Sequence, residues 1–180
     1  ARALLAEAGY PDGVEVTMDT VGAYKDIAEA VASLLTKGGF NTRVAVGEGA
    51  QMTQKWRTKG GPKSGDMYFT SWGNGSLDPF DIFTPTHRTN DRGNSAGYAN
   101  PEVDRLLDEA AVELDTEKRA ALYRKAYAEL QGDPAWLTLY NPHRAVGLRG
   151  DHPGFRMRED GVIDVADLPD FTSDRETAHG

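Results

Sequence analysis

Two aspartates, Asp78 and Asp81, flank the pair Pro79-Phe80 shortly after an aromatic segment that ends at Trp72. Paired carboxylates can serve as general bases or meet a charged group of a ligand. An Asp also caps turns, because its side chain accepts hydrogen bonds from nearby backbone N–H groups. From spacing alone turn capping is the favoured interpretation, and a small hydrolase or transferase that uses Asp78 or Asp81 as its base stays an alternative.

Other groups that do chemistry are missing or scattered. The chain has no Cys, which excludes disulfides, thiolate metal sites and Cys nucleophiles. No nucleophile elbow, phosphate-binding loop or dinucleotide-binding glycine motif occurs. The four histidines lack the i, i+4 spacing of a helical zinc site and are expected to be structural or solvated: His87, His143, His152 and His179. We therefore expect no catalytic residue, no metal and no cofactor.

The overall charge argues against one class of partner. The formal net charge is −8 and the pI is ≈ 5.0, whereas nucleic-acid binding needs Lys and Arg gathered on one face. We therefore expect no nucleic-acid partner. The nearest basic cluster is broken by Gly and Pro and is interpreted as a solvated loop: Lys55, Arg57, Lys59 and Lys63. No apolar run reaches about 18 residues, the length that a membrane-spanning helix needs.

The elements that must position these residues begin with a strand, a helix and a second strand. Residues 14–19 alternate apolar and polar side chains, as in a strand with one buried face. Apolar residues at helical spacing follow until Gly38-Gly39, and residues 42–46 form the second strand. Such a unit typically forms a parallel pair with a right-handed crossover, which indicates the α/β class.

The aromatic segment before the two aspartates is the third predicted strand. A helix is expected over residues 51–57 and the strand over residues 66–72, which are rich in β-favouring side chains. Residues 73–99 hold many Gly, Asn, Asp and Pro and are expected to be irregular. A long irregular segment that also carries aromatic residues is typical of binding loops.

Two amphipathic helices follow and should form a hairpin. Asn100 caps the first helix, and Asp115 or Thr116 caps the second. The apolar stripe of the first helix comprises Val103, Leu106, Leu107, Ala110, Ala111 and Leu114. These stripes are best explained as core, although a protein-interaction module is a further alternative. A buried strand is predicted over residues 135–140.

Several stretches of the sequence, taken in order, resemble one family. They are the opening A-R-A-L-L-A-E-A-G-Y-P-D-G, the segment Y-F-T-S-W-G with the D-P that follows it, G-Y-A-N-P-E-V-D-R-L-L-D-E-A, E-K-R-A-A-L-Y-R-K-A and W-L-T-L-Y. The series extends from Ala1 to near Gly150. It is similar to the peptide/opine/nickel-type solute-binding proteins (family 5) of bacterial ABC importers.

This resemblance implies the C-terminal lobe of a bilobed, periplasmic-binding-protein-like (type II) α/β fold, with a mixed sheet flanked by helices. Residues 1–136 would form the ligand-binding lobe, residues 137–168 would return toward an N-terminal lobe, and residues 169–180 would form a tail of little order. The chain starts inside a helical pattern, so we expect a fragment that lacks the N-terminal lobe and the targeting signal. Apolar surface without its partner lobe would favour self-association.

The resemblance also implies a function. Members of the family are extracytoplasmic receptors, periplasmic or lipid-anchored in Gram-positive bacteria. They close on a solute by hinge motion and present it to a permease in the cytoplasmic membrane. The expected partners are therefore a small solute and an ABC permease. Because no bond is made or broken, the chain is not expected to be an enzyme.

The ligand-facing stretch that the resemblance implies runs from Trp72 to Asp78. Trp72 would form an apolar wall, and Asn74 would offer amide donors and an acceptor. Gly73 and Gly75 would lie beside them, and Asp78 would shape the loop more than contact the solute. Further candidates from the same loop system are Arg88, Arg92, Tyr98 and Tyr140.

One position departs from the pattern of the family. Its peptide receptors place an Asp shortly after the Trp, where it pairs with the α-ammonium group of the peptide, and this chain has Gly75 or a neighbouring uncharged residue there. A buried ammonium group without a carboxylate would cost several kcal/mol. The resemblance therefore disfavours a simple peptide and favours an opine, a modified or glutathione-like peptide, or a sugar-like solute.

Overall fold

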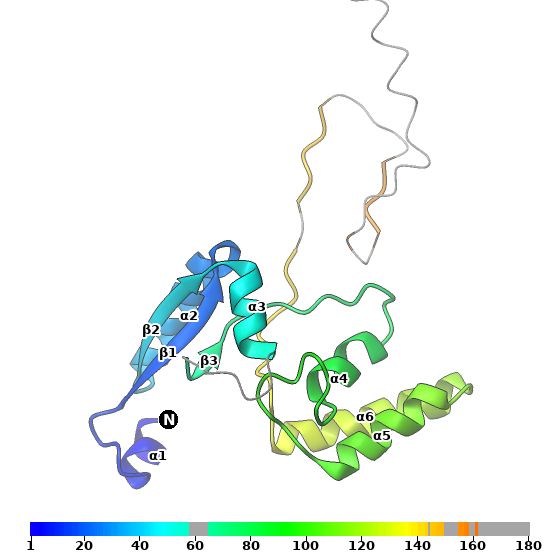
Figure 1. Ribbon diagram of the computed structural model, residues 1–180, viewed down its shortest axis with the longest axis horizontal. Coiled ribbons are helices and arrows are strands. Elements are labelled where there is room, and N and C mark those ends of the chain that lie inside the picture. Colours follow the sequence, from blue (N-terminus) through cyan, green and yellow to red (C-terminus); the bar gives the residue numbers. More distant parts are fainter. Residues whose placement is uncertain (58–64, 144, 150–154, 159–160, 162–180) are drawn as a thin grey trace, which may run out of the picture.

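The computed structural model describes residues 1–57, 65–143, 145–149, 155–158 and 161. In Figure 1 a small sheet with its helices lies beside a group of three helices, α4, α5 and α6. Along the chain the elements are α1 (Arg2–Glu7), β1 (Val14–Val21), η1 (Gly22–Tyr24), α2 (Lys25–Lys37), β2 (Phe40–Gly47), α3 (Gly49–Arg57), β3 (Met67–Tyr68), α4 (Phe80–His87), α5 (Pro101–Val112) and α6 (Thr116–Gly132).

The sheet has three strands in the order β2-β1-β3, and both pairings are parallel. β1 and β2 pair over their full length, from Val14 opposite Phe40 to Val21 opposite Gly47. This confirms the predicted parallel unit of strand, helix and strand. We predicted a mixed sheet, whereas the sheet within the described residues is purely parallel.

Two glycines close the amino end of the β1–β2 pair. Gly13 and Gly39 have φ values of +93° and +102°, a backbone region that side chains rarely adopt. A Cβ on Gly13 would lie 2.5 Å from the carbonyl oxygen of Gly39, and the N–H of Val14 donates to that oxygen at 2.9 Å. Glycine at these two positions therefore lets β1 and β2 start side by side.

The third strand is shorter than the sequence predicted. β3 pairs with β1 only where Met67 and Tyr68 lie opposite Met18 and Asp19. One residue further, the Thr20 hydroxyl donates to the carbonyl of Phe69 at 2.9 Å. From Thr70 onward the chain makes no further strand pairing and leaves the sheet, and the next element along the chain is α4.

Residues 73–99 are not wholly irregular, as the sequence had indicated, because they contain α4. Asp78 starts this helix by accepting a hydrogen bond from the N–H of Phe80 at 2.8 Å. Pro85 inside the helix hid it from sequence reasoning, since Pro lacks the N–H that would reach the carbonyl of Asp81. That carbonyl instead accepts the indole N–H of Trp72 at 2.7 Å.

The helix hairpin is as predicted. Asn100 caps α5 by accepting from the N–H groups of Glu102 and Val103, and Asp115 caps α6 by accepting from that of Lys118. The buried core of the hairpin comprises Val103, Leu106, Leu107, Ala110, Tyr123, Ala126 and Leu130, with Phe83, Tyr98 and Leu122 packed against it. Ala111 and Leu114 were wrongly assigned to the buried stripe, because α5 ends at Val112 and both side chains are exposed.

No strand forms over residues 135–140, where we predicted one. Residues 137–143 and 145–148 are extended and make no ladder with the described residues, and Figure 1 shows this segment running away from the helices. Leu137 is 76% exposed and Leu139 is 54% exposed. The predicted tail, residues 169–180, lies outside the described residues. No helix among the residues described is long and apolar enough to cross a membrane.

Candidate functional site

Trp72 lies just beyond the carboxyl end of the sheet. In the strand order β2-β1-β3 the chain passes from one side of β1 to the other, so the carboxyl ends of β1 and β3 form a topological switch point, the usual place for ligands in parallel sheets. The segments that leave these strands are joined there, because the Tyr24 hydroxyl and the Ser71 hydroxyl lie 2.5 Å apart. The site thus opens where parallel sheets typically bind ligands.

The indole of Trp72 is held on several sides. Its N–H bonds the carbonyl of Asp81, and the ring of Trp136 meets it edge-on with centroids 6.1 Å apart. A Cβ on Gly93 would lie 2.6 Å from Cη2 of Trp72 and 2.8 Å from the carbonyl of Pro85. The absence of a side chain at residue 93 therefore makes room for the indole.

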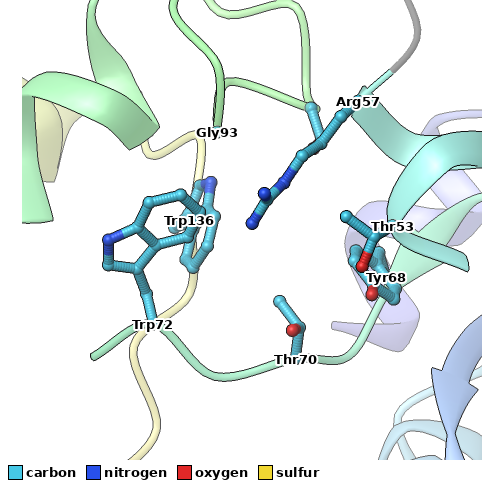
Figure 2. Close-up of a pocket in the computed structure, with 8 residues that line it drawn as sticks. Thr53, Arg57, Tyr68, Thr70, Trp72, Gly93 and Trp136 are labelled. Carbon is cyan, nitrogen blue, oxygen red and sulfur yellow. The ribbon is translucent and has the colours of Figure 1, made fainter. Parts of the chain in front are cut away.

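Two cations lie over the same indole. The guanidinium carbon of Arg57 is 5.0 Å from the ring centroid of Trp72, and that of Arg92 is 5.4 Å away, both within cation–π range. Figure 2 shows the Arg57 side chain reaching into the space between the two Trp rings and Thr70. Neither guanidinium forms an ion pair with another residue that the structure describes.

A small open pocket of about 50 Å³ lies between these groups (Figure 2). Besides Trp72, Trp136, Arg57 and Gly93, its lining is polar or amphipathic: Thr53, Tyr68, Thr70 and Ser95. A space of this size holds only a few water molecules, whereas ligand pockets typically enclose about 300–1,000 Å³. The pocket therefore suits one group of a solute and not a whole solute.

A buried histidine adjoins the pocket through Trp136. His87 is 8% exposed, and its ring lies 6.3 Å from those of both Trp136 and Tyr98. Burial lowers the pKa of His87 to about 4, although a hydrogen bond with the Phe83 backbone acts the other way. His87 is therefore neutral near pH 7, and it is a structural histidine, one of the two alternatives that the sequence had left open.

Two buried polar atoms lie in the same region without a partner among the described residues: the hydroxyl of Tyr98 and Oδ1 of Asn74. A buried acceptor or donor left unsatisfied costs about 1–3 kcal/mol. Asn94 fixes the backbone on either side of Tyr98, because its amide accepts from the N–H of Tyr98 at 2.9 Å and donates to its carbonyl at 2.7 Å. Tyr98 is thus held in place while its hydroxyl keeps hydrogen-bonding capacity.

Asp78 and Asp81 both bond other groups of the protein. Both oxygens of Asp78 bond Arg119, at 2.5 and 2.8 Å. Burial raises the pKa of Asp78, but the hydrogen bonds from Arg119 and the Phe80 N–H outweigh it, so the pKa lies below its usual value. Asp81 accepts from the N–H and hydroxyl of Ser76 at 3.0 and 2.6 Å. The hydrogen bond from the Phe80 N–H to Asp78 is that of a capped turn, whereas the ion pair with Arg119 joins two segments that are 41 residues apart. Both carboxylates therefore accept hydrogen bonds from other groups of the protein.

The remaining sequence candidates are dispersed. Gly73 and Gly75 are exposed, with no atom within 4 Å of an added Cβ. Arg88 binds Asp108 through two hydrogen bonds of 2.7 and 3.1 Å, away from the pocket. Tyr140 is 53% exposed on the extended segment. The structure therefore brings Trp72 and Arg92 together, connects Tyr98 to them through aromatic rings, and leaves Arg88 and Tyr140 apart.

Sequence reasoning missed three residues of this region. Lys55 and Arg57 were interpreted as part of a solvated loop, but Lys55 pairs with the buried Asp19 at 2.5 Å and Arg57 stacks on Trp72. Lys59 and Lys63 of that predicted loop lie outside the described residues. Trp136 was assigned to a buried strand. Arg57 carried no local signal in the sequence, because its position beside Trp72 depends on contacts between segments that are far apart in the chain.

No group of three or more His, Asp or Glu side chains that could hold a metal occurs among the described residues. No protein-family model matches the chain. The chain is 32% identical over 146 residues to heme-binding protein A of Haemophilus influenzae, which covers 76% of this chain and 26% of that protein. It is 27% identical over 149 residues to glutathione-binding protein GsiB of Salmonella typhi, which covers 77% and 29%.

Among solved structures, the ABC transporter-associated periplasmic binding protein DppA of Helicobacter pylori, in complex with the peptide STSA, matches with a TM-score of 0.64 and 25% identity. The match covers 74% of this chain and 27% of that chain. The chain thus spans about a quarter of the length of these relatives. Its fold is that of the type II periplasmic binding proteins, and its homologues are family 5 solute-binding proteins.

Proposed function

We propose that the protein containing this chain is an extracytoplasmic receptor that captures a small solute for an ABC permease. The observation that carries the proposal is the pocket at the switch point of the sheet, with Trp72 and Trp136 as apolar walls and two cations above Trp72. Relatives named for binding heme, glutathione and a peptide support it. Because DppA is named a periplasmic binding protein, we propose the same compartment here.

The chain would supply one lobe of the receptor. A pocket of about 50 Å³ is too small for a whole solute, so a second lobe would cover the remaining surface of the solute on closure. We propose that residues 1–136 form the C-terminal lobe and that the extended segment after Trp136 returns toward an N-terminal lobe elsewhere in the polypeptide. The exposure of Leu137 and Leu139 supports this, because the other lobe would bury them.

The charges favour an anionic group on the solute at this pocket. Arg57 and Arg92 lie over one ring without an ion pair to any described residue, and enclosing two cations in a closed cleft is costly unless an anion joins them. A carboxylate matches the fork of a guanidinium in shape and charge. Gly75, exposed beside the pocket segment, brings no carboxylate for an ammonium group. We therefore propose a carboxylate-bearing solute, such as an opine or a modified or glutathione-like peptide.

The contacts of the site weaken the two alternatives. Enzymatic use of Asp78 or Asp81 would require a free, basic carboxylate, yet Asp78 is bound by Arg119 and Asp81 by Ser76. The stripes of the helix hairpin, which could have served a protein-interaction module, pack against each other as a core. We propose that the protein binds its solute without turnover.

A thermal-shift screen tests this function. The longest natural polypeptide that contains this sequence is unfolded and refolded to remove carried solute, then melted with peptides, glutathione, heme, opines, oligosaccharides and nickel–histidine. A ligand at about 100 times its Kd should add roughly 2.7 kcal/mol of stability. Mass spectrometry of the mixture should show the stabilising compound unchanged. Conversion of that compound, or no shift with any class, would overturn the proposal.

Matched arginine variants test the anionic contact. Arg57→Gln and Arg92→Gln should each weaken binding of the stabilising compound about tenfold, the usual scale for one charge-assisted hydrogen bond. The control is Arg43→Gln on β2, whose guanidinium donates to the Thr17 hydroxyl at 3.2 Å. If all three variants bind equally well, the receptor proposal survives but the anionic contact does not.

A further inference from the structure

A buried aspartate lies under the helix that carries Arg57. Asp19 on β1 is 1% exposed, and a carboxylate so far from water needs partners. Among the described residues it has two, both on the last turn of α3: the ammonium group of Lys55 at 2.5 Å and the indole N–H of Trp56 at 2.9 Å, each bound to Oδ2. One carboxylate oxygen thus anchors two consecutive residues of the helix.

Those two residues directly precede Arg57. Successive side chains on a helix are about 100° apart, so a helix end that turns Lys55 and Trp56 toward β1 directs Arg57 away from the sheet. Arg57 is exposed and reaches the ring of Trp72, as Figure 2 shows. The direction of Arg57 therefore follows from the two contacts made by Asp19.

The surroundings of Asp19 connect the same carboxylate to the pocket. The ring of Trp56 stacks on that of Tyr68, with centroids 5.1 Å apart and planes 8° apart, and Tyr68 lines the pocket. On another side, a Cβ on Gly65 would lie 2.7 Å from the carboxylate, so the backbone there closes over it. The Asp19 carboxylate is therefore enclosed by the end of α3 and by Gly65, which lie close in the chain to the pocket residues Arg57 and Tyr68.

We infer that Asp19 is a positioning residue for solute recognition: by holding Lys55 and Trp56 it fixes the end of α3 and aims Arg57 at the pocket beside Trp72. The role of Arg57 toward a solute rests on the proposed function, but its position does not. A residue that only stabilised the fold would affect Arg57 and Arg92 alike, since both lie over one ring. A positioning residue should affect Arg57 alone.

Nuclear magnetic resonance separates these cases without a bound solute. In the longest natural polypeptide that contains this sequence, arginine is the one ¹³C-labelled residue, and Arg57→Lys and Arg92→Lys assign the two signals. Because both guanidinium groups lie over the Trp72 ring, its ring current should move the chemical shifts of Arg57 and Arg92 away from those of solvent-exposed arginines. Asp19→Asn keeps an acceptor for Trp56 but removes the charge that holds Lys55, and Trp56→Phe keeps an aromatic ring against Tyr68 but removes the N–H.

In Asp19→Asn and in Trp56→Phe, the Arg57 signal should lose most of its ring-current shift. The Arg92 signal should keep its ring-current shift in both variants. The matched control is Glu15→Gln on the same strand, whose carboxylate bonds the Asn41 amide at 2.9 Å and which should leave both signals in place. If Asp19→Asn does not fold, Trp56→Phe decides. An unchanged Arg57 signal in the folded variants, or equal loss of both signals, would overturn the inference. Because no solute is involved, failure of the receptor proposal gives a different result, the absence of any thermal shift.

Discussion

The guanidinium of Arg119 on α6 donates two hydrogen bonds, of 2.5 and 2.8 Å, to the carboxylate of Asp78, 41 residues earlier in the chain. The same arginine also donates to the carbonyl of Ala110 at 3.0 Å, at the end of α5. The turn before α4 is therefore fixed to the helix hairpin. Since α4 provides the carbonyl of Asp81 that holds the Trp72 indole, this ion pair connects the hairpin to the pocket.

Replacing Arg119 by Met should lower the thermal unfolding midpoint by about 2–4 °C, since a bidentate, partly buried pair contributes more than a surface pair. Differential scanning calorimetry measures it. Arg105→Met is the matched control, because its partners in the part of the chain that the structure describes are its helix neighbours Glu102 and Glu109 in solvent, where ion pairs contribute little. Equal shifts for both variants would show that the link to Asp78 adds nothing.

The same pair should give an acid-dependent part of the stability. Because the pKa of Asp78 lies below its usual value of 3.8, the folded state binds this proton less readily than the unfolded chain does. The contribution is present above that pH and is lost as the pH falls below it. The difference in unfolding free energy between wild type and Arg119→Met should therefore shrink in urea titrations as the pH is lowered from 3.8 and the Asp78 carboxyl takes up its proton. A difference that stays constant as the pH is lowered from 3.8 would contradict this assignment.

His87 should control stability in a higher range of pH. Its pKa is about 4 in the folded protein against 6.5 in an unfolded chain. Well above pH 6.5 His87 is neutral in both the folded and the unfolded state, and its contribution to stability is fully present. As the pH falls from 6.5 toward 4, His87 binds a proton in the unfolded chain but stays neutral in the folded protein. The free energy of unfolding should therefore fall by about 2.5 kcal/mol over this range. Urea titrations followed by tryptophan fluorescence measure it.

Two histidine variants make that prediction specific. His87→Phe keeps a ring among Phe83, Tyr98 and Trp136 and should flatten the pH profile relative to wild type. His143→Gln removes an exposed histidine and should leave the profile as it is. If the slope between pH 6.5 and 4 survives in His87→Phe, another group causes it.

The elements that were predicted correctly are those whose signals are local. The alternation in β1, the capping Asn100 and the stripe of α5 each depend on neighbours within a few residues. α4 was missed because Pro85 is a local signal against a helix, and the compensating partner, the indole of Trp72, is contributed by another segment. The predicted strand at residues 135–140 has the composition of a strand but no neighbour to pair with in the described residues.

The pocket residues differ in the same way. Trp72, which lines the pocket, stands in a recognisable stretch of sequence, and Arg92 lies in the same loops, and contact of either with a solute stays a prediction. Arg57 could not be predicted, since its importance depends on Asp19 turning the end of α3 and on Gly93 leaving room for the indole. These are contacts between residues far apart in sequence, and no local pattern along the chain predicts them.

Gly93 should be intolerant of even a methyl group. An added Cβ would lie 2.6 and 2.7 Å from two carbons of the Trp72 ring and 2.8 Å from the carbonyl of Pro85, so Gly93→Ala must displace the indole. Such overpacking typically costs about 1–3 kcal/mol. Urea unfolding measures the loss, and near-ultraviolet circular dichroism should report the moved tryptophan. In the control Gly73→Ala, nothing lies within 4 Å of the new atom, and stability should change by less than about 0.5 kcal/mol. Equal changes in stability for Gly93→Ala and Gly73→Ala would mean that the Trp72 indole can move aside without a cost in stability.

The extended segment after Trp136 should make the 180-residue chain associate with itself. Leu137 and Leu139 are 76% and 54% exposed, and residues two apart in an extended chain share one side. An exposed apolar strand without a neighbour is a template for pairing with another copy.

Sedimentation velocity over a range of concentrations should therefore show oligomers, and Leu137→Lys with Leu139→Lys should shift them to monomer, because charges on an edge oppose pairing. Leu114→Lys is the control: that leucine is 96% exposed but lies in the turn between α5 and α6, outside the extended segment, so oligomers should persist. In the longest natural polypeptide, a second lobe would cover Leu137 and Leu139, and wild type should be monomeric. Oligomers there with the same dependence on Leu137 and Leu139 would show that no lobe covers the segment, and the two-lobed receptor would lose its main support from this region.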